Sequence, residues 1–168
     1  MEIQQSHHEF KSVPIEHKIV LIAENIRTPE NVGMMMRLSE AFGVEKIYFV
    51  GDHAVELTTK VKRASRNTYK TMDYEFGLNG LKILESLMSS GYHSIALEIT
   101  DRSKPIQNFQ SEKYKKMVLI VGSERQGISE GMLKISQSHF HIPMYGKNSS
   151  INVVNALSIG LFKLTEKC

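Results

Sequence analysis

The sequence predicts an α/β domain with a mostly parallel sheet and helices on both faces. Short apolar runs at residues 19–23, 46–50, 93–99 and 117–121 are rich in β-branched side chains, which is typical of strands buried on both faces. Helical segments separate these runs, and this alternation favours parallel pairing. A chain of 168 residues is long enough for one well-buried domain.

The polar N-terminal segment differs from the rest of the chain. Residues 1–16 mix Gln, His, Glu, Lys and Ser with little periodicity, and Pro14 closes the stretch. We therefore expect residues 1–17 to form a flexible arm and residues 18–168 to form the single domain.

Composition excludes several classes of protein. The formal net charge is only +3, so a basic surface must be local. The single cysteine is Cys168, which rules out an intramolecular disulfide and fits a reducing compartment. No Cys/His metal spacing and no membrane-length apolar run occur, so we expect a cytoplasmic protein without a metal or a membrane partner.

The first helix follows the first strand and has recognisable ends. Thr28 can cap it, Pro29 suits its first position, and Gly43 ends it. Gly33 lies inside this helix and costs about 1 kcal/mol relative to Ala, so we expect a tight packing contact there. Asn31 and Arg37 point in different directions, and for this helix alone a solvated Arg37 is the simpler interpretation.

A basic segment follows the second strand. Residues 57–70 contain five cations and no carboxylate, and they also hold the polar side chains of Ser65, Asn67, Thr68 and Tyr69. A solvated face is one interpretation. We favour the other, a surface that binds RNA phosphates. Its predicted RNA-binding residues are Lys60, Lys62, Arg63, Arg66 and Lys70.

The middle of the chain predicts a helix at residues 81–88, the strand at 93–99 and a polar loop at 100–105. The strand at 117–121 leads into the loop at 122–130. This loop is not a phosphate-binding P-loop, because it lacks the Gly-Lys-Ser/Thr ending and Glu124 would repel a triphosphate. A dinucleotide-binding fingerprint is also absent. We expect a short helix from Ser129 to Ile135.

The C-terminal segment has the character of a binding loop. A strand at 139–144 leads into Gly146, Ser149 and Ser150, and a last helix runs from about Asn152 to Glu166. Glycine permits close approach of a ligand to the backbone, and a helix N-terminus offers unpaired N–H groups. An ordinary turn with Ser150 as N-cap explains the spacing equally well.

Three motifs occur in order along the chain. They are Asn31-x-Gly33-x-x-x-Arg37, Gly122-x-Glu124-x-x-Gly127, and Ile142-Pro-Met-x-Gly146 with Ser150-Ile-Asn152-Val-x-x-Ala156. From Lys18 to the C-terminus the chain closely resembles the SpoU, or TrmH-like, branch of the SPOUT RNA methyltransferases. The resemblance implies a C-terminal trefoil knot, an exception to the rule that protein chains are unknotted.

The resemblance also implies methyl transfer from S-adenosylmethionine to a ribose 2′-hydroxyl of RNA. We expect tRNA, because no separate N-terminal RNA-binding domain is present; rRNA and a non-enzymatic RNA-binding module are the alternatives. The catalytic residues carried over by motif are Arg37, Asn31, Glu124, Ser150 and Asn152. The cofactor would contact Leu97, Glu98, Val121, Gly122, Ile142, Met144, Gly146, Ser150 and Ile151.

The sequence leaves the role of Arg37 and the oligomeric state open. Arg37 could act as a base made effective by an RNA phosphate, or as a cation that orients phosphate and stabilises the alkoxide. The wide apolar arcs of the first and last helices favour a homodimer with shared active sites, as the resembling family implies, although both helices could be buried within one chain.

Overall fold

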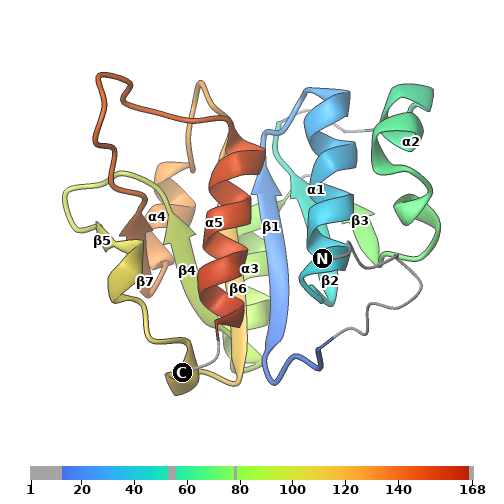
Figure 1. Cartoon of the computed structure of the whole chain (residues 1–168). Helices are drawn as coiled ribbons and strands as arrows, with labels where there is room; N and C mark the ends of the chain where they lie inside the picture. Colours follow the sequence, from blue (N-terminus) through green and yellow to red (C-terminus); the bar gives the residue numbers. More distant parts are fainter. Residues whose placement is uncertain (1–12, 53–55, 78, 167–168) are drawn as a thin grey trace, which may run out of the picture.

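The strands of the described chain form one parallel sheet. The computed structural model describes residues 13–52, 56–77 and 79–166, and its seven strands lie in the order β3-β2-β1-β6-β4-β7-β5 (Figure 1). Every pair of neighbouring strands is parallel. The strands are β1 (Lys18–Glu24), β2 (Lys46–Val50), β3 (Tyr74–Phe76), β4 (His93–Leu97), β5 (Lys104–Pro105), β6 (Lys116–Val121) and β7 (Ser138–His141).

Helices cover both faces of the sheet, as predicted. They are α1 (Pro29–Ala41), α2 (Thr59–Ser65), α3 (Gly80–Ser89), α4 (Glu130–Ile135) and α5 (Val153–Thr165), with the 3-10 turns η1 (Thr68–Lys70), η2 (Ile106–Asn108) and η3 (Ser111–Lys113). Side chains of α1, α2 and α5 share one core with the sheet, and those of α3 and α4 share the other. In Figure 1, α1 and α5 lie in front of the sheet, and α2 lies to the right of α1, on the side away from α5.

Strand periodicity explains the two cores. In β1, Leu21 belongs to the core under α1 and α5, whereas the next residue, Ile22, belongs to the core under α3 and α4. Successive strand side chains point to opposite faces, and both residues are completely buried. A strand buried on both faces needs the continuous apolar sequence of residues 19–23.

The predicted ends of the elements are close to the observed ones. Thr28 occupies the N-cap of α1 without a side-chain capping bond, and Gly43 has a φ of +66° just beyond the helix. The strand predicted at 93–99 ends at Leu97, and the one predicted at 139–144 ends at His141, before Pro143. The interpretation of Ser150 as N-cap is wrong, because Asn152 caps α5 by accepting from the N–H of Val154 at 2.8 Å.

The tight contact predicted at Gly33 exists, and its partner is α2. A Cβ added at Gly33 would lie 2.6 Å from the Cβ of Ala64 and 2.7 Å from the carbonyl oxygen of Val61. Such distances are far inside ordinary contact, so only glycine lets α1 and α2 approach this closely.

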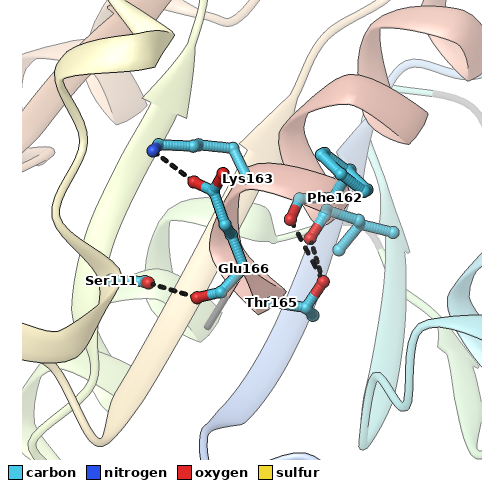
Figure 2. A network of polar contacts seen from close by, with 6 residues as sticks. Ser111, Phe162, Lys163, Thr165 and Glu166 are labelled. Atoms are coloured by element: carbon cyan, nitrogen blue, oxygen red, sulfur yellow. Dashed lines mark hydrogen bonds and ion pairs between the residues drawn. The ribbon is translucent and has the colours of Figure 1, made fainter. Parts of the chain in front are cut away.

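Polar contacts close the end of α5 (Figure 2). The Ser111 hydroxyl in η3 donates to the backbone oxygen of Glu166 at 3.2 Å, and the Thr165 hydroxyl donates to the backbone oxygens of Leu161 and Phe162. Lys163 pairs with the Glu166 carboxylate. These bonds fix the C-terminal end of α5, the end opposite the loop that precedes the helix.

The predicted arm, residues 1–17, falls mostly outside the described residues, as does Cys168. Residues 13–16 have no helix or strand and are exposed. The division into arm and domain therefore stays a prediction.

Candidate active site

Two adjoining cavities lie where β4, β6 and β7 end. Their volumes are about 450 Å³ and about 100 Å³. Leu97, Glu98, Ile99, Ser150 and Ile151 line both cavities, which makes them two parts of one site. The carboxyl edge of a parallel sheet is where open α/β proteins bind ligands.

The cavities collect almost all of the predicted cofactor residues. Leu97, Glu98, Ser150 and Ile151 line both cavities, Val121 and Gly122 line the larger one, and Ile142 and Met144 line the smaller one.

Gly146 lies in the same loop but lines neither cavity. A Cβ added there would meet no atom within 4 Å. Close packing within the chain therefore does not require glycine at this position, and its contact with a cofactor stays a prediction.

The loop after β6 folds tightly on itself through two glycines. A Cβ on Gly122 would lie 2.1 Å from the backbone of Gly127, and Gly127 has a φ of +64°. The N–H of Gly127 donates to the oxygen of Ser123 at 2.8 Å. Both positions require glycine, the first for space and the second for its backbone conformation.

Two carboxylates hold this loop against the sheet. Glu98 accepts from the N–H of Ile128 at 3.2 Å, and Glu24 accepts from the N–H of Ser129 at 2.7 Å. Glu24 is buried at the end of β1 and was not predicted as a site residue. Its one sequence signal is a carboxylate at the end of a strand that is otherwise apolar.

Three polar side chains from distant motifs meet beside the larger cavity. The Asn31 amide in α1 donates to Glu124 Oε1 at 2.9 Å. The Asn152 amide lies 3.3 Å from the same oxygen and 3.4 Å from Asn31 Oδ1. Asn31 is buried, so the hydrogen bond to Glu124 satisfies an amide that water does not reach freely.

Arg37 is the predicted catalytic residue that the structure leaves apart from this cluster. Its side chain is exposed and makes no hydrogen bond or ion pair with any described residue. Arg37 follows Gly33 by four residues and therefore lies on the side of α1 that packs against α2. It also neighbours Met34, which is 43% exposed.

The five predicted RNA-binding cations all lie on α2 and the turns that follow it. Thr58 caps this helix by accepting from the N–H of Val61 at 3.2 Å. Each cation is exposed, and within the described chain none forms an ion pair. They are Lys60, Lys62, Arg63, Arg66 and Lys70.

Carboxylates outnumber cations near the larger cavity. Glu98, Glu124 and Arg125 line it, and Glu24 holds its loop. None of the three carboxylates forms an ion pair among the residues described. Over residues 13–52, 56–77 and 79–166, no group of three or more His, Cys, Asp or Glu is placed to hold a metal ion. No helix of the described chain is both long and apolar enough to cross a membrane.

Comparison with known proteins assigns the family. The model of the SpoU rRNA methylase family matches residues 18–162. A tRNA (guanosine(18)-2′-O)-methyltransferase of Aquifex aeolicus is 30% identical over 147 residues, which cover 86% of this chain and 67% of that protein. Other curated relatives are longer, and the chain spans 58% or 59% of them.

Solved structures share the fold. An AdoMet-bound rRNA methyltransferase from Sinorhizobium meliloti superposes with a TM-score of 0.82 at 22% identity, over 90% of this chain and 57% of that one. The A. aeolicus TrmH/SpoU tRNA-modifying enzyme gives 0.79 at 23% identity, over 90% and 76%. The resemblance seen in the three sequence motifs is therefore confirmed, and the chain belongs to the SpoU rRNA methylase family.

Proposed function

We propose that the protein transfers a methyl group from S-adenosylmethionine to a ribose 2′-hydroxyl of RNA, with tRNA as the substrate. The observation that carries this proposal is the meeting of Asn31, Glu124 and Asn152 beside a ligand-sized cavity. The names of the Aquifex relative and of the AdoMet-bound neighbour support it. An rRNA substrate is the second candidate, since other relatives are named tRNA/rRNA methyltransferases.

The lining of the cavity suits this cofactor. Leu97, Ile99, Val121 and Ile142 offer apolar contacts, and Gly122 places backbone on the wall of the larger cavity. The carboxylates near the cavity suit a cationic ligand, and the cofactor supplies its methyl group on a positively charged sulfur.

The chain itself must place the ribose oxygen, whose proton passes to Arg37 or, where Arg37 stays a cation, to water. An oxygen held in line with an activated methyl group needs little further help, so positioning supplies much of the catalysis. Asn31 and Asn152 fix the direction of the Glu124 carboxylate. Arg37 orients an RNA phosphate and stabilises the developing alkoxide, or acts as a base when a phosphate lies beside it.

We further propose a homodimer built on α1 and α5. These helices pack side by side and expose Met34 (43%), Ile159 (40%) and Phe162 (62%). We take these exposed apolar side chains on two packed helices as parts of one contiguous patch, the kind of surface that marks a protein interface. Arg37 borders this face and lies apart from the Asn31 cluster of its own chain, so it would complete the active site of the partner.

We also propose that the C-terminal segment forms a trefoil knot. The chain leaves β7, passes through residues 142–152 and returns across β4 to reach α5, which packs on β4 and β6 through Gly160 (Figure 1). This return crossing is the path on which the family threads its C-terminal segment.

Calorimetric titration with S-adenosylmethionine tests the site. Ala156 lines both cavities from the first turn of α5, so Ala156→Leu should fill them and weaken binding at least tenfold. Asn155→Leu puts the same leucine side chain at the preceding, exposed position and should bind as the unsubstituted protein does. Absence of binding by the unsubstituted protein would favour a non-enzymatic RNA-binding module.

A further inference from the structure

An aromatic ring lies close to two lysines on the α2 and η1 surface. The Nζ atoms of Lys62 and Lys70 are each 5.8 Å from the centre of the Tyr69 ring. Tyr69 is half-buried and packs partly against the core. The protein therefore supports the ring, and two mobile ammonium groups lie within cation–π distance of it.

A strained turn builds this arrangement. Arg66 and Asn67, between α2 and η1, have φ values of +46° and +73°, in the left-handed region that side chains other than glycine rarely adopt. The turn reverses the chain and brings Tyr69 beside Lys62, seven residues earlier. Holding two consecutive residues in the left-handed region costs free energy. Backbone strain of this type is concentrated at functional sites.

The lysines around Tyr69 are available to an anion. None of the cations on α2 and η1 forms an ion pair within the described part of the chain. The tyrosine–lysine pair on another face differs, because Tyr92 lies 5.5 Å from Lys116 but donates its hydroxyl to the Glu45 carboxylate at 3.0 Å. The Tyr69 hydroxyl has no such acidic neighbour among its hydrogen-bond partners in the described residues.

We propose that Tyr69 stacks on an unpaired nucleobase, while phosphates on either side of that nucleotide meet Lys62 and Lys70. This inference rests on the proposed RNA-directed function and names its substrate class, a single-stranded segment of RNA. Bases inside a duplex are covered by their neighbours, whereas unpaired bases are free to stack on aromatic side chains. Basic surfaces with interleaved aromatic residues are typical of proteins that bind single strands.

The position of this surface fits the role. α2 has seven residues, so it is about 10 Å long and matches a short stretch of strand. It packs directly on α1 through Gly33, on the same side as Arg37. A strand held on Tyr69 would therefore be held next to the residue that we expect to act on its backbone.

Binding to three RNA probes tests the proposal. The probes are a short unstructured strand, the same strand annealed into a duplex, and the same strand with abasic sites, which keeps the phosphates and removes bases. Tyr69→Leu keeps the apolar contact with the core and should weaken binding of the first probe about tenfold. It should leave binding of the duplex and the abasic strand unchanged, and Tyr69→Phe should bind all three as the unsubstituted protein does.

Tyr92→Leu is the matched control, because it removes a tyrosine beside a lysine on another face, and it should change no affinity. Equal losses on all three probes, or no loss on the first, would overturn the proposal. Titration of the same variants with S-adenosylmethionine separates the two claims. If Tyr69→Leu weakens binding of the unstructured strand but the protein binds no cofactor, the stacking site stands and the methyltransferase function fails. If the protein binds the cofactor but Tyr69→Leu leaves RNA binding unchanged, the methyltransferase function stands and the stacking site fails.

Discussion

Glu124 is held by two amides that arrive from different ends of the chain. Asn31 precedes it by 93 residues and Asn152 follows it by 28. Each amide donates to the same carboxylate oxygen, Oε1, so the direction of the carboxylate depends on both. Hydrogen bonds to a charged group are stronger than those between neutral groups, and this cluster is correspondingly sensitive to single substitutions.

Asn31→Asp should damage this cluster without changing its size. The substitution replaces the donor 2.9 Å from Glu124 by a second carboxylate, so a hydrogen bond becomes a repulsion. We expect thermal unfolding to show a stability loss of about 1–3 kcal/mol, and methyl transfer to fall more steeply. Adding Glu124→Gln to the same protein reverses donor and acceptor and should recover stability. Failure of this rescue would show that the cluster is not held as described.

Some of these residues could be predicted and others could not. Asn31, Glu124 and Asn152 stand in recognisable motifs, but spacing alone does not reveal contacts between residues so far apart. Glu24 was missed because a carboxylate at the end of a strand looks the same whether it faces water or binds a loop. The close approach of a ligand to Gly146 stays a prediction, because contacts within the chain do not test it.

At the scale of elements, the apolar runs predicted the central strands, and Gly51 and Gly122 marked where β2 and β6 end. The short edge strands escaped prediction. β3 has three residues, too few to show a period, and β5 has two, one of which is Pro105. Proline is disfavoured in strands except at edges, where its missing N–H costs nothing. The basic segment at 57–70 was assigned as a surface, and its fold into α2 and η1 depends on the left-handed turn at Arg66 and Asn67.

The α1–α2 contact makes a testable element-scale prediction. Gly33→Ala places a methyl group 2.6–2.8 Å from Ala64, Val61 and Ser65, two of these contacts being with backbone atoms. The helices must separate, so we expect a loss of about 1–3 kcal/mol in the free energy of unfolding, together with weaker RNA binding. Urea denaturation measures the first effect and filter binding the second.

Gly131→Ala in α4 is the control for this change. Its added methyl group meets only Leu81 at 3.9 Å, an ordinary contact. Because alanine favours helix, the control should gain up to about 1 kcal/mol. A Gly33→Ala protein as stable as this control would show that α1 and α2 are not packed as tightly as the structure indicates.

At the scale of the whole molecule, the exposed face of α1 and α5 predicts the oligomeric state. Light scattering should give twice the 19.1 kDa mass of the chain. Phe162→Glu puts a charge in the proposed interface and should give the monomer mass, whereas Leu81→Glu, on α3 across the sheet, should not. A monomer mass for the unsubstituted protein at micromolar concentration would exclude the dimer.

Shared active sites follow from the position of Arg37. Arg37→Ala should keep its affinity for the cofactor and lose most of the transfer rate, because it lies away from the cavity. Mixing it with the cofactor-deficient Ala156→Leu protein should restore part of the activity through mixed dimers, in which one site keeps both Arg37 and an open cavity. No recovery despite measured subunit exchange would mean that each site is built from one chain.

Methyl transfer to RNA is the decisive assay for the proposed function. Unmodified tRNA transcripts are incubated with the protein and S-adenosylmethionine labelled in its methyl group, and the RNA is then digested with a ribonuclease that needs a free 2′-hydroxyl. We predict labelled dinucleotides that resist digestion, since methylation of the ribose oxygen protects the adjoining phosphodiester. Label recovered only in single nucleotides would mean base methylation, and RNA without label, from protein that binds both ligands, would contradict the proposed function.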